Sequence, residues 1–285
     1  MSSLTLQSPA KVNLFLRVTG KRPDGYHNIV TLFERISLCD TISLTATAKN
    51  KIQIQCAHPH VPQGRKNLVY KAAEMLKDDF GIRQGVKIFI HKRIPVAAGL
   101  AGGSSNAATA LKGLNQLWRL RLSKNQLLSY ARKLGSDVAF FLYDCPWALG
   151  TERGDHIRPL RLKTQLWHIV VTPKVKIYSR TVYERLKLKL TKKNDDVNIL
   201  IQSLRKNDIF QVGQVIQNDL EATILRLSPS LATLKKRLNS LKSQGVMISG
   251  SGPSVFGLLL TQSEGQKLKR LLMRSFSQVF VVRTL

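Results

Sequence analysis

The sequence predicts an α+β fold, in which helices and strands are mixed without strict alternation. Two observations support this class. Strand-like segments cluster within the first fifty residues, and the first helical pattern begins only at Asn67. A segment rich in Gly, Ala and Ser then joins a strand to a helix over residues 95–106. A doubly wound parallel sheet would instead alternate strand and helix along the chain.

Alternation of apolar and polar residues predicts the strands. The first of them is followed by Arg22-Pro23-Asp24-Gly25, whose composition is typical of a turn. In order along the chain, strands are expected over residues 12–18, 29–38, 41–45, 86–90, 167–172, 255–260 and 279–282.

Apolar residues spaced three or four positions apart predict the helices. Gly81 is suited to ending the helix that begins at Asn67. Ser123 and Gln126 have the spacing of a capping box, and Gly135 would stop the helix that they open. Further helices are expected over residues 107–118, 231–241 and 268–272.

A weak domain boundary lies near residues 155–162, where His156, Arg158 and Pro159 interrupt the pattern. It predicts two domains, residues 1–157 and residues 158–285. The chain of 285 residues is long enough for one large domain or two modest ones.

The charge of the chain is extreme. Lys and Arg number 45 and Asp and Glu number 17, which gives a formal net charge of +28. This balance excludes an acidic, solvating protein. It indicates polyanionic partners, which could be nucleic acid, an anionic membrane surface or phosphorylated small molecules.

Cysteine usage and hydropathy point to a cytoplasmic protein. Its three cysteines are too scattered for a disulfide framework. No run approaches the roughly 18 apolar residues of a membrane span, and the N-terminus lacks the pattern of a secretory signal. Cys56, His58 and His60 lie close together, but no second pair of ligands follows, so a polar loop is expected there rather than a metal site.

The segment from Pro95 to Asn106 suits phosphate binding. Small residues let the backbone approach an anion, and the N-terminus of the following helix adds partial positive charge. Ser104 and Ser105 can offer hydroxyl groups to phosphate or to Mg²⁺. The alternative is a flexible turn with a serine cap. The segment is not a Walker A motif, because no Gly-Lys-Ser/Thr closes it.

Three segments together resemble the kinase superfamily that covers galactokinase, homoserine kinase, mevalonate kinase and phosphomevalonate kinase. They are residues 8–13, the glycine-rich segment and residues 248–254. The resemblance narrows to members that act on a cytidine-diphosphate-linked methylerythritol. The narrowing rests on Lys11-Val12-Asn13-Leu14, Arg22-Pro23-Asp24-Gly25-Tyr26-His27, Leu134-Gly135-Ser136-Asp137-Val138 and Asn218-Asp219-Leu220-Glu221.

The resemblance implies a two-domain small-molecule kinase fold. An N-terminal ATP-binding α+β domain would be followed by a ferredoxin-like substrate domain, with the active site in the cleft between them. ATP would phosphorylate the 2-hydroxyl of the cytidyl substrate. Relatives acting on homoserine, mevalonate or a sugar are the alternative, because they share the fold. A basic nucleic-acid-binding protein is a further alternative, although the basic residues are scattered and no recognition motif is evident.

The resemblance assigns catalysis to two residues. Asp137 would orient the attacking hydroxyl and receive its proton, which phosphoryl transfer requires. The alternative is that Asp137 caps the apolar run over residues 138–142. Lys11 would lie beside Asp137, keep it ionised and stabilise the transferring phosphoryl group. The alternative for Lys11 is an ordinary surface charge.

The resemblance also assigns binding residues. Tyr26 and His27 would hold the cytosine, and Tyr183 would sandwich the base against Tyr26; an exposed aromatic turn is the alternative for the first pair. For Asn67 and Lys92, placed at the ATP end, a helix cap and a surface charge are alternatives. Substrate binding is assigned to Asn13, Tyr26, His27, Ser179, Tyr183, Gly250, Ser251 and Gly252. ATP binding is assigned to Pro95, Ala97, Ala98, Gly99, Leu100, Ala101, Gly102, Gly103, Ser104, Ser105, Asn67 and Lys92.

The expected ligands are therefore ATP and a cytidine-diphosphate-linked polyol. No carboxylate ligand for a metal stands out, so Mg²⁺ would be held by ATP phosphates, water and a loop serine. We expect a monomer or weak dimer, with neither nucleic acid nor a membrane as partner.

Overall fold

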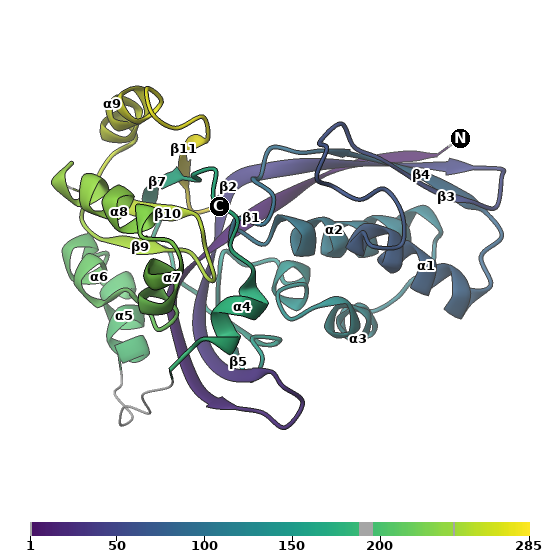
Figure 1. The fold of residues 1–285 in the computed structure, drawn as a ribbon. Coiled ribbons are helices and arrows are strands. Elements are labelled where there is room, and N and C mark those ends of the chain that lie inside the picture. The colour runs from purple at the N-terminus through teal and green to yellow at the C-terminus, as the bar shows by residue number, and fades with distance from the viewer. Residues whose placement is uncertain (1, 188–195, 242) are drawn as a thin grey trace. The chain divides into compact units, whose positions relative to one another are not determined.

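The computed structural model describes residues 2–187, 196–241 and 243–285 (Figure 1). Its strands are β1 (Ser3–Lys21), β2 (His27–Thr47), β3 (Ile52–Gln55), β4 (Gly85–His91), β5 (Trp147–Thr151), β6 (His156–Pro159), β7 (Trp167–Val171), β8 (Gln217–Asn218), β9 (Val246–Ile248), β10 (Val255–Leu259) and β11 (Val279–Arg283). Its helices are α1 (Leu68–Phe80), α2 (Gly102–Leu117), α3 (Lys124–Leu134), the 3-10 helix η1 (Ala139–Leu142), α4 (Ser179–Glu184), α5 (Asp196–Arg205), α6 (Ile209–Val215), α7 (Glu221–Leu227), α8 (Ser230–Ser240) and α9 (Gln262–Leu272).

Two compact units are built from interleaved segments of the chain. Unit 1 comprises Met1–Ala10, Leu38–Val96 and Ala101–Asp144, and unit 2 comprises Lys11–Ser37, Ala97–Leu100 and Cys145–Leu285. Strands β1 and β2 and the glycine-rich segment therefore contribute residues to both units. The domain division at residues 157 and 158 stays a prediction; in unit 2, strand β6 spans these positions and pairs with β5.

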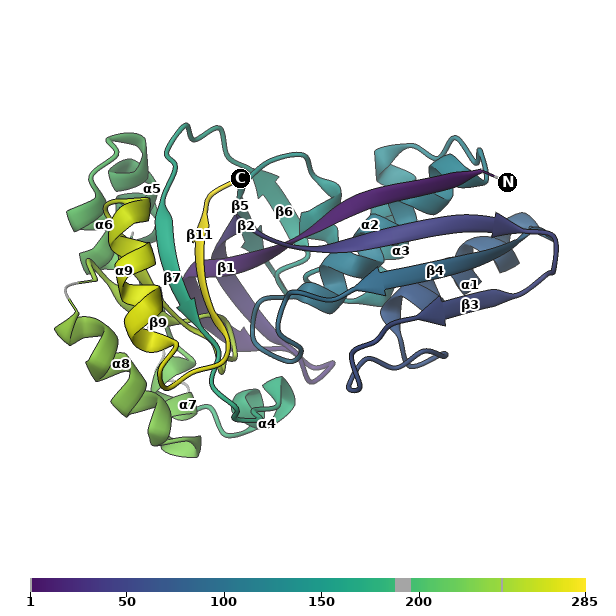
Figure 2. The ribbon, with the colours of Figure 1, turned by 90° about the horizontal axis from the view of Figure 1, so that it is seen from above.

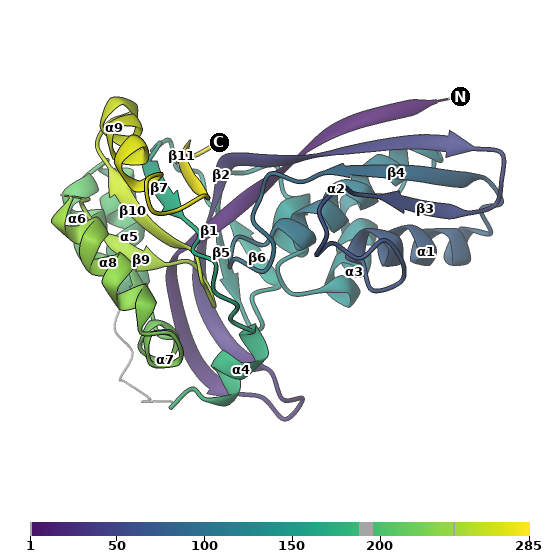
Figure 3. The ribbon, with the colours of Figure 1, turned by 45° about the horizontal axis from the view of Figure 1, so that its top comes forward.

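Unit 1 places helices on one face of a sheet. Strand β4 pairs antiparallel with β2 and parallel with β3, and α1, α2 and α3 cover the same face (Figure 3). Helix α1 begins at its cap Asn67 and ends at Gly81, whose φ of 58° is left-handed. The capping box of Ser123 and Gln126 opens α3, as its spacing predicts.

Unit 2 contains an antiparallel sheet of order β11-β7-β10-β9. Helix α8 packs on β9 and β10, and α9 packs on β7 and β11 (Figure 2). This order and direction are those of the split β-α-β arrangement of ferredoxin-like folds. Leucines at helical spacing on α8 join the core of the sheet, which includes Leu231, Leu234, Leu238, Ile169, Val171, Ile248 and Val255.

The mixture of sheet and helix confirms the α+β class, but several element bounds differ from prediction. The strands predicted over 29–38 and 41–45 are one strand, β2, because the polar residue between them, Asp40, is buried and hydrogen-bonded. Helix α2 starts at Gly102, so the glycine-rich segment itself forms the first helical turn. Residues 156–159, which were expected to interrupt the pattern, form β6.

In the part of the chain that the structure describes, no helix is both long and apolar enough to span a membrane. The same residues contain no group of three or more His, Cys, Asp and Glu side chains placed to hold a metal ion. His58 and His60 instead form part of a loop, in which the backbone N–H of His60 donates to His58 Nδ1 at 3.3 Å.

Candidate active site

Lys11 is a buried lysine whose ammonium group is held in one position. Strand β1 turns Lys11 and Asn13 to the same face, because side chains alternate along a strand. Lys11 Nζ donates to Asn13 Oδ1 at 2.5 Å, and Asn13 Nδ2 donates to Thr31 Oγ1 at 2.7 Å. Thr31 in turn donates to the carbonyl of Phe15 at 2.7 Å. With 4% of its surface exposed, Lys11 is not an ordinary surface charge.

A second Gly/Ser cluster, residues 249–254, approaches this ammonium group. Gly250 has a φ of 55°, and a Cβ on it would lie 3.1 Å from Asn13 Oδ1 and 3.4 Å from Lys11 Nζ. Asn218 Nδ2 fixes the cluster by donating to the carbonyls of Ile248 and Gly250 at 2.9 and 2.8 Å. Glycine is therefore required here both for backbone conformation and for close approach.

The part of the glycine-rich segment that lies in unit 2 is bonded to the same cluster. Ser249 Oγ donates to the carbonyl of Gly99 at 3.0 Å, and the backbone N–H of Ser254 donates to the carbonyl of Ala98 at 3.2 Å. A Cβ on Gly99 would collide with the Ser249 carbonyl oxygen. These contacts place residues 97–100 beside the second Gly/Ser cluster.

The part that lies in unit 1 forms an open helix N-terminus. Ala101 is the cap of α2 and has a left-handed φ of 53°, an uncommon conformation for a residue with a Cβ. The first N–H groups of a helix have no partner within it and carry partial positive charge. Nothing lies within 4 Å of a Cβ built on Gly103, so an anion has room to approach this turn.

A buried polar cluster anchors the first turn of α2 within unit 1. Asp40 Oδ2 accepts from Lys92 Nζ at 2.5 Å and from Asn106 Nδ2 at 2.8 Å. Asn106 Nδ2 also donates to Ser8 Oγ at 2.9 Å, and Ser8 donates to Ser105 Oγ at 2.8 Å. The Lys92 and Asp40 side chains are 5% and 0% exposed. Lys92 is thus a buried ion-pair partner, and Asp40 is a residue that sequence reasoning missed.

Asn67 is a helix cap in the structure. Its Oδ1 accepts from the backbone N–H of Val69 at 2.9 Å, and its Nδ2 donates to the carbonyl of Pro62 at 2.6 Å. Both ends of the amide are therefore engaged by the protein. These contacts are those of a helix cap, the alternative considered for Asn67. Its contact with ATP stays a prediction.

Asp137 lies between α3 and η1 and is half-buried. The cap position of η1 is Val138, one residue later, which has no polar side-chain atom. Asp137 itself is therefore not the cap residue of this helix. Asp137 belongs to unit 1 and Lys11 to unit 2, and their pairing stays a prediction.

The aromatic residues of unit 2 form a stacked pair beside an exposed ring. His27 and Tyr183 have ring centroids 5.1 Å apart and planes 28° from parallel. Tyr183 therefore stacks on His27 in this structure, whereas the sequence placed it against Tyr26. Burial, aided by the charge of Lys21, lowers the pKa of His27, which favours a neutral ring at pH 7. Tyr26 is 56% exposed.

Arg153 is a second residue of this site that sequence reasoning missed. Its guanidinium lies 5.2 Å from the centroid of the Tyr26 ring and is held by Asp155 at 2.5 Å. The hydrogen bond that Arg153 donates to Asp155 is the main cause that raises the pKa of Arg153. No motif or spacing in the sequence signals this contact, because it joins two turns that are far apart along the chain.

Ser179 and Ser251 are brought together, as residues of one site should be. Their hydroxyl oxygens lie 2.6 Å apart, which joins the start of α4 to the second Gly/Ser cluster. In unit 2 the structure thus gathers Lys11, Asn13, Gly99, Ser179, Gly250 and Ser251 through direct contacts. Such a site offers a fixed cation and backbone donors to an anionic substrate.

The fold and the glycine-rich segment define a class of protein. Residues 67–145 match the family described as GHMP kinases N terminal domain, and residues 200–276 match GHMP kinases C terminal. The superfamily predicted from the sequence is therefore confirmed, and the class is that of a small-molecule kinase.

More similar relatives narrow this class. The 4-diphosphocytidyl-2-C-methyl-D-erythritol kinase of Geobacillus kaustophilus is 41% identical over 99% of this chain and 97% of its own length. The enzyme of the same name from Bacillus velezensis is 40% identical over 97% of this chain and 95% of its own. A crystal structure of 4-(cytidine 5'-diphospho)-2C-methyl-D-erythritol kinase, 31% identical, superposes with a TM-score of 0.86 over 99% of this chain and 100% of that one. The chain belongs to the family of 4-diphosphocytidyl-2-C-methyl-D-erythritol kinases.

Proposed function

We propose that the chain transfers the γ-phosphoryl group of ATP to the 2-hydroxyl of 4-diphosphocytidyl-2-C-methyl-D-erythritol. The observation that carries the proposal is the stacked His27–Tyr183 pair with exposed Tyr26, in the same unit as Lys11. Flat aromatic faces suit a pyrimidine base. Homoserine and mevalonate offer no base to stack, so this feature favours the cytidyl substrate over those of the related kinases.

In the proposed reaction, the oxygen of the substrate 2-hydroxyl attacks the γ-phosphorus of ATP. Asp137 accepts the proton that this hydroxyl loses. The bond between that phosphorus and the bridging oxygen breaks, and ADP leaves. Lys11, held by Asn13 at 2.5 Å, supplies a fixed positive charge beside the reacting oxygens. The neutral ring that the lowered pKa of His27 favours keeps one acceptor nitrogen for the base edge.

The open first turn of α2 is the proposed seat of the ATP phosphates. The Asp40–Lys92–Asn106 cluster holds that turn from beneath, which makes Lys92 a positioning residue in this proposal. Ser104 is half-buried, whereas Ser105 is fully buried and bonded by Ser8. We therefore assign the loop oxygen for Mg²⁺ to Ser104, a hard donor of the kind that Mg²⁺ prefers. When bound, Mg²⁺ neutralises charge on the phosphates.

The direct test is coupled ADP release with each purified substrate. We expect turnover with the cytidyl compound and none above background with homoserine, mevalonate or galactose. Turnover with one of those three and none with the cytidyl compound would replace the proposal with that activity.

We propose also that the protein works in the cytoplasm as a monomer or weak dimer, with no nucleic acid or membrane as partner. The scatter of its basic residues along the chain argues against a nucleic-acid partner, because a nucleic-acid site gathers them on one face. Sedimentation at several concentrations would measure the oligomeric state.

A further inference from the structure

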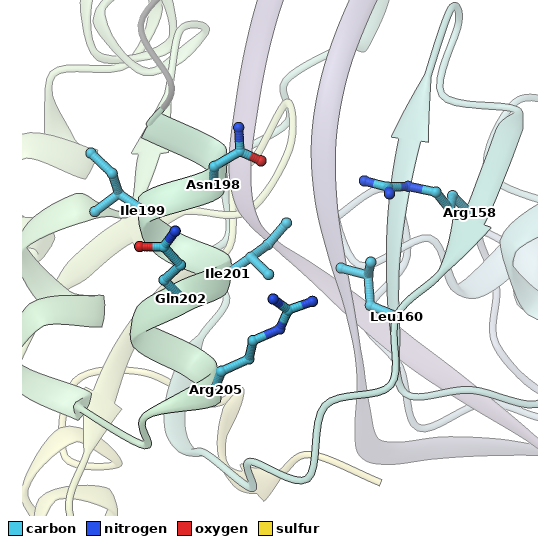
Figure 4. A pocket seen from close by; sticks show the side chains of 7 residues that line it. All are labelled: Arg158, Leu160, Asn198, Ile199, Ile201, Gln202 and Arg205. Carbon is cyan, nitrogen blue, oxygen red and sulfur yellow. The ribbon is translucent and has the colours of Figure 1, made fainter.

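A pocket of about 420 Å³ lies in unit 2 beside β6 and α5, and the proposed reaction does not use it (Figure 4). None of its lining residues is among those assigned to ATP or to the cytidyl substrate. The lining residues are Arg158, Leu160, Asn198, Ile199, Ile201, Gln202 and Arg205.

Two guanidinium groups enter this pocket from opposite walls. Arg158 extends from β6 and Arg205 from the last turn of α5, and the two side chains point toward each other (Figure 4). Among the described residues that line the pocket there is no Asp or Glu. The acidic residue at the start of the same helix, Asp196, is paired elsewhere, with Arg17. Like charges that face each other repel, and an anion between them would remove that repulsion.

Helix α5 also brings apolar and amide side chains to the pocket. Residues 198, 201, 202 and 205 recur at helical spacing, so α5 presents one face to the pocket. Ile201 is buried and Leu160 is half-buried, which gives an apolar surface next to the two arginines, whereas Ile199 is exposed and points away from them (Figure 4). Asn198 and Gln202 add amide groups that donate hydrogen bonds.

We propose that this pocket binds a phosphate monoester or diphosphate that carries a short apolar chain. The bidentate geometry of guanidinium suits the phosphate oxygens. The aliphatic side chains shield the chain of the ligand from water. This site stands whether or not the proposed function holds, because none of its residues takes part in that function.

A protein of net charge +28 binds anions at many places, so the experiment compares two variants of equal charge. The first is R158Q/R205Q. The control is R270Q/R274Q, which removes two exposed arginines in or just after α9 of the same unit. Each protein is titrated calorimetrically with butyl phosphate, inorganic phosphate and 1-butanol at one ionic strength. Phosphate that binds at the glycine-rich segment does so equally in the wild type and both variants. It therefore does not affect the comparison between them.

We expect the wild type to bind butyl phosphate more tightly than inorganic phosphate, and 1-butanol not at all. In R158Q/R205Q the dissociation constant for butyl phosphate should rise about tenfold or more, because the hydrogen bonds from the two charged guanidinium groups are lost. The control should stay close to wild type. An equal loss in both variants would mean adventitious ion binding only and would overturn the site. Equal affinity for both phosphates would overturn the apolar part of the proposal.

Discussion

At the scale of single residues, the arrangement around Lys11 explains why a lysine is buried in a strand. A buried ammonium group is costly unless it is hydrogen-bonded. Asn13 meets that need on one side, because Thr31 holds its amide with the oxygen toward Lys11. These contacts position Lys11, and the contact of Asn13 with substrate stays a prediction.

Tyr26 gives a prediction at this scale. Removing its ring in Tyr26→Ala should raise the KM for the cytidyl substrate, because stacking on a base contributes roughly 1–3 kcal/mol. The KM for ATP should stay nearly unchanged. Steady-state kinetics with each substrate varied in turn would measure both.

The matched control is Phe210→Ala, which removes an aromatic ring of similar exposure from α6. It should leave both constants unchanged. If Tyr26→Ala raised both KM values equally, the ring would have no special role toward cytosine and a folding defect would explain the loss.

Single residues also mark the limit of sequence reasoning in this site. The motifs around Lys11, Gly99 and Gly250 could be identified because each is local. Asp40 and Arg153 could not, because the contacts of Asp40 with Lys92 and of Arg153 with Tyr26 join residues far apart along the chain. For the same reason the sequence paired Tyr183 with Tyr26, whereas the structure stacks it on His27.

At the scale of elements, local signals predicted the ends of α1 and α3 well, but the starts of α2 and α9 lie five or six residues before the predicted ones. Asn67, Gly81 and the Ser123 capping box act through bonds within four or five residues. Strand β2 was predicted in two pieces because buried Asp40 breaks its apolar pattern. The compensation for that break comes from Lys92 and from the backbone N–H groups of residues 93 and 94, which only the fold brings near.

Asp40 gives a prediction for α2 and its neighbours. Asp40→Ala would leave the Lys92 ammonium buried without its carboxylate, and breaking a buried pair costs about 3–5 kcal/mol. Chemical denaturation should show a loss of that order in the free energy of unfolding. Asp144→Ala, which removes the exposed partner of Lys112, should cost less than about 1 kcal/mol. Similar losses in the two variants would contradict the anchoring role of Asp40.

At the scale of the whole molecule, the net charge of +28 is the dominant feature. Repulsion among like charges destabilises a compact state, and salt screens it. Raising ionic strength from about 0.01 to 0.1 M shortens the screening length from roughly 30 to 10 Å. The melting temperature at pH 7 should therefore rise with sodium chloride over this range. A melting temperature that fell with salt would mean that attractive pairs outweigh the repulsion.

The two residues proposed to act in one chemical step come from different compact units. Lys11 belongs to unit 2 and Asp137 to unit 1. Groups that act together in one chemical step show non-additive losses when they are removed. We therefore expect Lys11 and Asp137 to be coupled in catalysis.

The most direct measurement is kcat with saturating ATP and cytidyl substrate for Lys11→Met, Asp137→Asn and the double variant. ATP affinity of each, measured separately, checks the fold. We expect Asp137→Asn to lower kcat by at least about 10²-fold, the usual contribution of acid–base catalysis. The double variant should lose little more kcat than the worse single variant. A near-normal kcat for Asp137→Asn, or losses that multiply in the double variant, would contradict these expectations.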